Sequence, residues 1–240
     1  QTYLQLFPER VRSVVLDGVV PQTEALGIDV AKDAQRALDH IFSRCGADAQ
    51  CSAAFPQLEN EFEALLATLQ NAPADVELVD PLSGKTEQTQ LTLEEFVMAV
   101  RLISYAPETA AMLPLLIHNA YSQKDYSALA AQYRIVARPL ESSISGGMGY
   151  SVLCSEDYPF FSQYDANEKT VESYYGDFQL TSLADICAVW PAQAVDAAFK
   201  EPIRADVPVL LLSGEDDPVT PPENAAEAAR DLPNSLAVTA

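Results

Sequence analysis

The feature that most constrains the fold is a short apolar run near the C-terminus that is followed by a glycine and a carboxylate. The run Val209–Leu212 stops at Ser213 and Gly214, and Asp217 follows three residues after that glycine. Such a run is typical of a strand buried on both faces of a parallel sheet. The pattern therefore places Asp217 at the carboxyl end of a strand, where open α/β sheets hold their functional groups.

The residues after Asp217 predict the start of a helix. Thr220 offers an N-cap hydroxyl, Pro221 suits the first helical position, and Glu223 completes a Thr-x-x-Glu capping box. The same stretch supports a plainer interpretation, because Asp-Asp-Pro is also good turn chemistry. From these residues alone, Asp217 is either a reactive carboxylate or the cap of a turn.

The two ends of the chain begin and stop inside predicted elements. Residues 1–7 carry apolar side chains at helical spacing with no N-cap before them, and a strand over Arg12–Gly18 follows. Residues 234–240 have the pattern of a further strand. Because domains seldom begin in mid-helix, we expect residues 1–240 to be a piece of a longer polypeptide.

Two segments carry a specific family resemblance: QLFPERVRSVVLDGVVP at residues 5–21 and LLLSGEDDPVTP at residues 210–221. They resemble the tripeptidyl- and prolyl-aminopeptidase (TAP-like) branch of the α/β-hydrolases. The resemblance implies an α/β fold, with a partial parallel-sheet core, in which Asp217 is the acid of a catalytic triad in the order Ser…Asp…His. It also implies a serine just upstream of Gln1 and a histidine just downstream of Ala240.

The remainder of the triad is absent from the 240 residues. No Gly-x-Ser-x-Gly elbow occurs, and the nearest approach, at Gly149-Tyr-Ser151, lacks the second glycine. His40 and His118 are the only histidines. Both precede Asp217, which is the wrong order for this family, and both lie in predicted amphipathic helices. We therefore expect them to be surface or packing residues.

Between the core segments, residues 1–20 and 206–240, lies a large, mainly helical insertion over residues 21–205. Apolar periodicity and capping signals, among them Thr92-x-x-Glu95, predict helices over residues 30–46, 56–71, 92–105, 107–122 and 126–137, with a hairpin pairing 75–80 with 87–92. Such an insertion is expected to act as a lid that excludes water and shapes the substrate pocket. The alternative is a separate helical binding domain.

Four cysteines, Cys45, Cys51, Cys154 and Cys187, allow three disulfide pairings, and their spacing does not choose among them. The Cys-x5-Cys spacing fits a zinc site poorly, whereas buried free thiols remain an alternative. The family resemblance implies the pairs Cys45–Cys51 and Cys154–Cys187. Disulfides would place the protein in an oxidising compartment, so we expect a periplasmic or secreted location.

The stretch Ser145–Phe161 contains three glycines in four residues and then a short apolar run. We expect that run to be a strand that delivers Glu156 and Asp157 among aromatic side chains. The resemblance implies that these acids bind the α-ammonium group of a peptide substrate. Alternatively, the two carboxylates cap the next element or pair with a nearby arginine.

Composition excludes some functions. The net charge of −21 argues against a nucleic-acid partner. No apolar run approaches the roughly 18 residues that a membrane span needs. No cofactor or metal is expected, because the sequence has neither a glycine-rich phosphate loop nor a metal-ligand cluster.

Together, these features predict an exported serine aminopeptidase whose partner is a peptide with a free N-terminus. A carboxylesterase with the same triad is the alternative enzyme. A catalytically empty fragment with a binding or structural role is the alternative of another class. The oligomeric state is not predicted.

Overall fold

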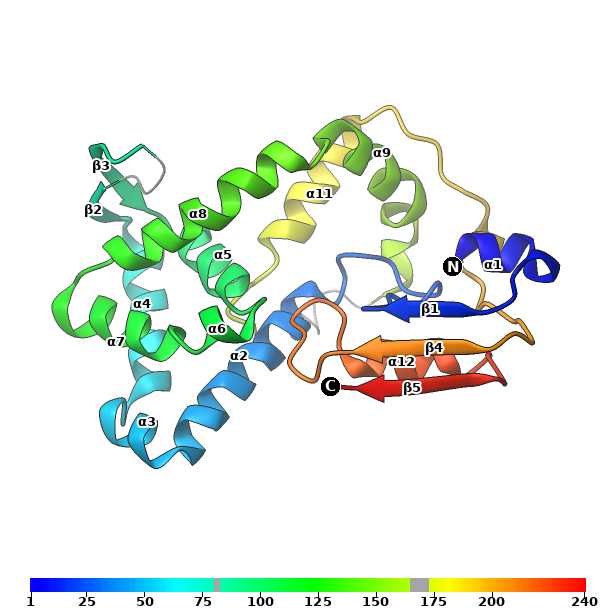
Figure 1. The fold of residues 1–240 in the computed structure, drawn as a ribbon. Coiled ribbons are helices and arrows are strands. Elements are labelled where there is room, and N and C mark those ends of the chain that lie inside the picture. Colours follow the sequence, from blue (N-terminus) through cyan, green and yellow to red (C-terminus); the bar gives the residue numbers. More distant parts are fainter. Residues whose placement is uncertain (80–82, 165–172) are drawn as a thin grey trace. The chain divides into compact units, whose positions relative to one another are not determined.

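The computed structural model describes residues 1–79, 83–164 and 173–240 (Figure 1). Its contacts divide the chain into two compact units. Residues 1–34 and 146–240 form the first, here called the sheet unit, and residues 35–145 form the second, the helical unit. The contacts that define the two units do not test whether residues 21–205 are an insertion in the sequence of the core. These boundaries therefore stay a prediction.

The sheet unit contains a three-stranded parallel sheet with the order β1-β4-β5, as Figure 1 shows. β1 spans Val14–Asp17, β4 spans Val209–Ser213 and β5 spans Ser235–Thr239. β4 is central, and its Leu210 lies opposite Val15 on one side and Leu236 on the other. The sheet confirms the α/β class predicted from the apolar runs.

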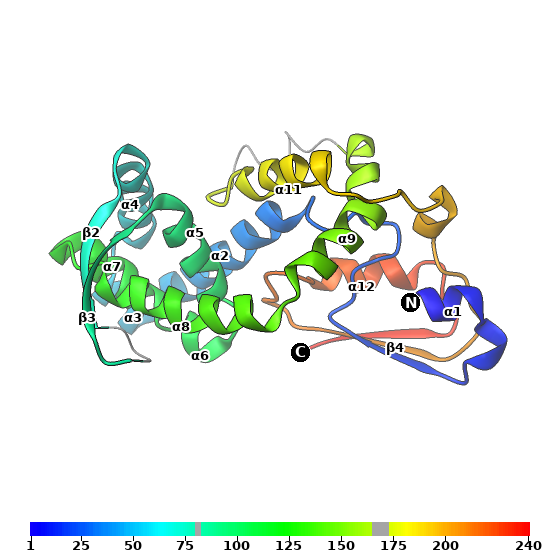
Figure 2. The ribbon, with the colours of Figure 1, turned by 90° about the horizontal axis from the view of Figure 1, so that it is seen from above.

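Helices α1 (Thr2–Leu6) and α12 (Pro222–Ala229) cover one face of this sheet, and Figure 2 shows α12 lying along β4. The core on this face contains eight buried residues: Leu4, Val19, Ile203, Ala205, Val209, Leu211, Ala225 and Leu232. Burial alternates along β4, so Leu210 and Leu212 are only half-buried. The prediction that this strand is buried on both faces is therefore wrong for the sheet unit.

The sheet unit also contains helices α9 (Gly146–Glu156) and α11 (Phe178–Val189), with short 3-10 helices η1 (Pro8–Arg10), η2 (Tyr158–Gln163) and η3 (Ala197–Lys200). A disulfide between Cys154 and Cys187 joins α9 to α11. The strand predicted before Glu156 is wrong, because these residues form α9. A short apolar run fits a buried helix as well as a strand, and its periodicity does not distinguish the two.

The helical unit confirms most of the predicted elements. α2 (Val30–Ala47) enters it from the sheet unit, and the rest are α3 (Ala49–Ala54), α4 (Leu58–Asn71), α5 (Leu93–Ile103), α6 (Pro107–Ala110), α7 (Leu113–Gln123) and α8 (Ser127–Ser143), with an antiparallel hairpin of β2 (Ala74–Val79) and β3 (Thr86–Leu91). One predicted helix, 107–122, is divided into α6 and α7. Pro114 lies in the first turn of α7, where the lack of a proline N–H is tolerated; deeper in one continuous helix it would remove a hydrogen bond.

Local features stabilise the helical unit. The Thr92–Glu95 capping box forms as predicted, with both reciprocal hydrogen bonds present. A disulfide between Cys45 and Cys51 joins the end of α2 to α3. In the core, the ring of Phe62 packs between Phe42 and Phe96, at centroid distances of 5.7 and 5.6 Å.

Candidate functional site

The loop that carries Asp217 leaves the central strand at the carboxyl edge of the sheet. We call residues 214–220 the acid loop; it connects the end of β4 to α12. The backbone N–H of Glu215 donates to the carbonyl of Ala240 at 2.9 Å, and the N–H of Ala240 donates to the carbonyl of Ser213 at the same distance. The acid loop is therefore tied directly to the end of β5.

Three hydrogen bonds orient the Asp217 carboxylate. Oδ1 accepts from the backbone N–H groups of Val219 at 2.8 Å and Thr220 at 2.9 Å, and Oδ2 accepts from the Thr220 hydroxyl at 2.7 Å. The two bonds to Oδ1 are the turn contacts that aspartate commonly makes with the backbone that follows it. Asp217 thus caps its own loop, and this capping also gives the carboxylate a defined orientation at the sheet edge.

The predicted capping box after Asp217 does not form. Helix α12 begins at Pro222, and its N-cap, Pro221, offers no side-chain hydrogen bond. The Thr220 hydroxyl donates to Asp217 instead. Thr220 therefore lies one residue before the N-cap position, where its oxygen would have to be to accept a hydrogen bond from the first turn of the helix.

Gly18, directly after β1, approaches the acid loop closely. Its N–H donates to the carbonyl of Leu212 at 3.0 Å, and its φ angle is +61°. A Cβ atom at this position would lie 2.9 Å from Thr220 Oγ1 and 4.0 Å from Asp217 Oδ2. Our sequence analysis missed this residue, although an Asp-Gly pair directly after a strand is a turn signal that could have identified it.

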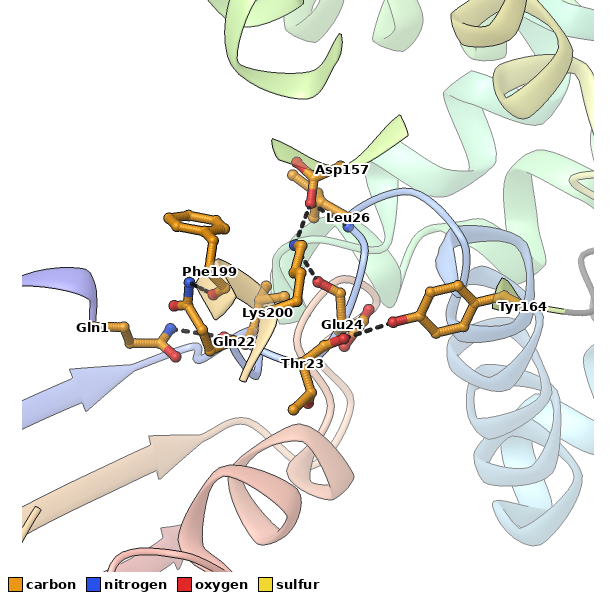
Figure 3. Close-up of polar contacts among 10 residues, drawn as sticks. Gln1, Gln22, Thr23, Glu24, Leu26, Asp157, Tyr164, Phe199 and Lys200 are labelled. Carbon is orange, nitrogen blue, oxygen red and sulfur yellow. Dashed lines mark hydrogen bonds and ion pairs between the residues drawn. The ribbon is translucent and has the colours of Figure 1, made fainter. Parts of the chain in front are cut away.

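The N-terminal end of α1 contacts the segment that follows β1. The Gln1 side-chain amide donates to the carbonyl of Val20, shortly beyond the end of β1, at 2.7 Å (Figure 3). The residues directly after β1, the acid loop and Ala240 lie at the carboxyl ends of the three strands, and Gln1 contacts the segment that follows β1.

Asp157 is buried, with 6% of its surface exposed, and it lies in an ion pair. Figure 3 shows its carboxylate facing Lys200, whose ammonium group is 2.8 Å from Asp157 Oδ1 and donates to the carbonyl of Glu24 at 2.6 Å. The N–H of Leu26 donates to the same carboxylate oxygen at 2.9 Å. The partner is thus a lysine rather than the arginine considered from the sequence.

Glu156, the last residue of α9, differs from its neighbour. It is half-buried, and its carboxylate makes no hydrogen bond or ion pair with another residue that the structure describes. Neither Glu156 nor Asp157 hydrogen-bonds to the acid loop. The structure therefore places the two predicted groups of site residues in the same unit without joining them directly.

Tyr164 contacts the backbone next to Glu24, the residue whose carbonyl accepts from Lys200. The Tyr164 hydroxyl donates to the carbonyl of Thr23 at 2.6 Å (Figure 3), and Thr23 donates in turn to Glu227 of α12 at 2.7 Å. Burial, reinforced by nearby carboxylates that include Glu24, raises the pKa of the Tyr164 phenol above its ordinary value. The neutral phenol is the form that donates this hydrogen bond.

The remaining candidate groups have other roles. His118 Nδ1 lies 2.9 Å from Glu61 Oε2, inside the helical unit, so His118 packs against a carboxylate there. Both disulfides join the cysteines that the family resemblance pairs. Across residues 1–79, 83–164 and 173–240, no cluster of three or more histidine, cysteine or acidic side chains could hold a metal, and no helix has the length and apolar character to cross a membrane.

One pocket in the sheet unit, of about 200 Å³, lies away from these groups. α1, α12 and residues 21–23 contribute to its lining, which includes none of Asp217, Glu156 and Asp157. The geometry around Asp217, rather than this pocket, therefore defines the candidate site.

Comparisons with known proteins agree with the α/β fold of the sheet unit. A family model described as "TAP-like protein", of the α/β-hydrolases, matches residues 172–240, a stretch that includes Asp217. The chain is 22% identical over 247 aligned residues to proteins named "Serine protease Hip1" from Mycobacterium tuberculosis and Mycobacterium bovis. The alignment covers 98% of this chain and 47% of the relative. The chain thus spans about half the length of the curated relatives it matches.

Proposed function

We propose that this chain belongs to the TAP-like family of α/β-hydrolases, whose model matches residues 172–240, and that Asp217 is the acid of a Ser-Asp-His triad in a secreted or periplasmic serine aminopeptidase. The observation that carries the proposal is the position of its carboxylate. Asp217 follows the central strand and is held by three hydrogen bonds at the carboxyl edge of the sheet. Open α/β sheets bind and react with ligands at this edge.

The proposed role of Asp217 is electrostatic and orienting. In a triad, the acid accepts a hydrogen bond from the histidine ring, fixes its tautomer and stabilises the imidazolium that forms as serine attacks the carbonyl carbon. The acid itself is not protonated. A carboxylate that is already held by Val219 and Thr220 suits this role, because little reorganisation is needed during the reaction.

We propose that the serine and histidine lie outside residues 1–240, and two contacts support this. The N-terminal end of α1 is tied to Val20, so a serine just before α1 would lie near the end of β1. Ala240 is hydrogen-bonded to Glu215 of the acid loop, so a histidine soon after β5 would enter beside Asp217. Both groups would then meet at one edge of the sheet.

We assign recognition of the substrate's α-ammonium group to Glu156, with Asp157 as its structural neighbour. Glu156 is half-buried with no partner among the described residues, so its carboxylate is available to a ligand. Asp157 is already neutralised by Lys200. A partly desolvated carboxylate attracts an ammonium group strongly, which would restrict cleavage to peptides with a free N-terminus.

The disulfides support a location outside the cytoplasm. Two disulfides form from the four cysteines, and disulfides persist mainly in oxidising compartments. We therefore propose that the substrate is a peptide outside the cytoplasm.

The test uses the full-length protein and a fluorophosphonate probe, with intact mass as the readout. One covalent adduct is expected. Asp217→Asn should lower turnover by about ten-thousand-fold while leaving the fold intact. Glu215→Gln, which removes a charge from an exposed residue of the same loop, is the matched control and should keep its turnover. Near-normal turnover of Asp217→Asn would overturn the assignment of Asp217.

Substrate class needs a second comparison. Peptides with free and acetylated N-termini should differ strongly in kcat/KM, and Glu156→Gln should reduce that difference. An esterase with the same triad would cleave esters regardless of an amine, so equal rates on the two peptides would favour the esterase. A full-length protein that forms no adduct would leave only a binding or structural role.

A further inference from the structure

Thr220 holds both oxygens of the Asp217 carboxylate. Its backbone N–H donates to Oδ1 at 2.9 Å, and its hydroxyl donates to Oδ2 at 2.7 Å. Two donors from one residue, one on each oxygen, oppose rotation of the carboxylate about its Cβ–Cγ bond. Thr220 is only 8% exposed, so water has little access to replace the hydroxyl.

Gly18 determines where that hydroxyl can lie. It is anchored by the hydrogen bond from its N–H to Leu212 at the end of the β1–β4 pairing. A Cβ atom here would be 2.9 Å from Thr220 Oγ1, a distance that real Cβ contacts essentially never show, and the φ of +61° is also unfavourable for other residues. The hydroxyl thus reaches Asp217 because residue 18 has no side chain.

We infer that Thr220 and Gly18 are positioning residues that act on the reaction through Asp217. The inference rests on the proposed role of Asp217 as the triad acid and extends it to residues on two different segments. A triad acid works by orienting the histidine ring, so a modest rotation of its carboxylate misplaces the ring and lowers the rate. The end of β1 would thereby contribute to catalysis without touching the substrate.

Two replacements of Thr220 distinguish the effect of its hydroxyl on turnover from the effect of its side-chain shape. Thr220→Val keeps the branched shape and removes the donor. It should lower kcat about tenfold to a hundredfold, as expected for a hydrogen bond to a charged group, with little change in KM. Thr220→Ser retains the hydroxyl and should restore most of the turnover. Thr109→Val is the matched control, because the Thr109 hydroxyl also makes a partly buried hydrogen bond, to the carbonyl of Ile103.

Replacement of Gly18, compared with a second glycine, distinguishes the effect of contact with Thr220 from the effect of backbone strain. Gly18→Ala should lower kcat by displacing the Thr220 hydroxyl. Gly176→Ala is its matched control, because Gly176 has nearly the same φ, +62°, but no heavy atom within 4 Å of an added Cβ. Both variants carry the cost of a left-handed alanine, and only Gly18→Ala should lose turnover.

A double variant tests whether the two residues act together. Once Thr220→Ala has removed the hydroxyl, the added methyl of Gly18→Ala has no oxygen to displace. The two substitutions should therefore lower kcat by less than the product of their separate effects. Independent effects on kcat would mean that Gly18 acts by another route.

The outcomes distinguish this inference from the proposed function. If Asp217→Asn keeps its turnover, the triad assignment fails. If Asp217→Asn loses turnover while Thr220→Val behaves like the wild type, or Thr220→Ser is as slow as Thr220→Val, only the positioning role fails. Should the full-length protein lack hydrolase activity, the unfolding free energies of Thr220→Val, Asp217→Ala and their double variant still test the contact, and additive losses would overturn it.

Discussion

Two threonines with the same local sequence pattern behave differently in the two units. In the helical unit, Thr92-x-x-Glu95 forms a reciprocal capping box at the start of α5. In the sheet unit, Thr220-x-x-Glu223 does not, because α12 begins one residue later than the pattern predicts and its N-cap is Pro221. The Thr220 hydroxyl belongs instead to the turn around Asp217, to which it donates. The same pattern therefore caps a helix only where the threonine occupies the N-cap position.

Each unit contains a carboxylate that contacts a basic side chain, and the two pairs differ in how deeply they are buried. Glu61 and His118 lie on α4 and α7, which both belong to one continuous stretch of sequence. Asp157, directly after α9, and Lys200 of η3 contact the backbone at Leu26 and Glu24, so they connect three separate segments. Polar side chains hold distant segments together in both units, because Glu61 and His118 are 57 residues apart in the sequence and Asp157 and Lys200 are 43 apart. The Asp157–Lys200 pair differs in that both of its side chains are largely buried.

The largest predicted loss of stability follows from breaking the Asp157–Lys200 pair. Lys200→Met leaves a buried carboxylate uncompensated and should destabilise the protein by about 3–5 kcal/mol, as measured by denaturant unfolding. Lys32→Met is the control, because Lys32 is 61% exposed and its distance of 3.9 Å to Asp29 makes only a surface pair; its loss should stay below about 1 kcal/mol.

The counterpart in the helical unit sharpens the contrast. Glu61→Gln should cost less than Lys200→Met, because the His118 side chain is 33% exposed and neutral histidine can still hydrogen-bond to the amide. Equal losses for Glu61→Gln and Lys200→Met would show that the deeper burial of the Asp157–Lys200 pair gives it no special structural weight.

The disulfides give the second contrast. Cys154–Cys187 closes a sequence separation of 33 residues and Cys45–Cys51 one of 6. In the chain-entropy description, these correspond to about 4 and about 2 kcal/mol of stabilisation. Replacing both cysteines of each pair by serine should therefore destabilise the sheet unit more than the helical unit. Denaturant unfolding of the two double variants would contradict this if the order were reversed.

The third contrast compares the two threonines directly. Thr92→Ala removes an N-cap and should cost about 1 kcal/mol of stability while turnover stays unchanged. Thr220→Ala should lower turnover, because it releases Asp217, whereas no helix cap is lost. Paired measurements of unfolding free energy and kcat for both variants test the distinction. A turnover loss for Thr92→Ala would show that the two threonines are not separable in this way.

Local signals in the sequence predicted the helical unit well, since its helices, hairpin and capping box depend on neighbouring residues. In the sheet unit the strands were predictable from apolar runs, as was the position of Asp217 after β4. The helix α9 was not, because a short apolar run fits either element. The contacts of Lys200 with Asp157 and of Gly18 with Thr220 were not predictable either, because each depends on how separate segments meet. The hydrogen bond of Thr220 to Asp217 spans only three residues and was missed because Thr220 was assigned to the helix cap.

The smallest predicted effect concerns two tyrosines, the buried Tyr126 in the helical unit and the half-buried Tyr164 in the sheet unit. Burial raises the pKa of Tyr126 in the helical unit, and burial together with nearby carboxylates raises the pKa of Tyr164 in the sheet unit. In the unfolded chain these phenols ionise near an ordinary value of about 10. Above that pH the unfolded state binds fewer protons than the folded state, so stability falls as pH rises until the folded pKa is passed.

Tyr164→Phe should therefore make the fall in stability above about pH 10 shallower. Below that pH it should cost about 1 kcal/mol, for the lost hydrogen bond to Thr23. Tyr126→Phe should also reduce the fall, but added salt should change the contribution of Tyr164 more, because carboxylates help to raise only its pKa. Unfolding free energies between neutral pH and pH 11 at two salt concentrations would measure this. An equal salt response of the two tyrosines would show that burial alone governs both, and the electrostatic difference between the units would then not extend to these side chains.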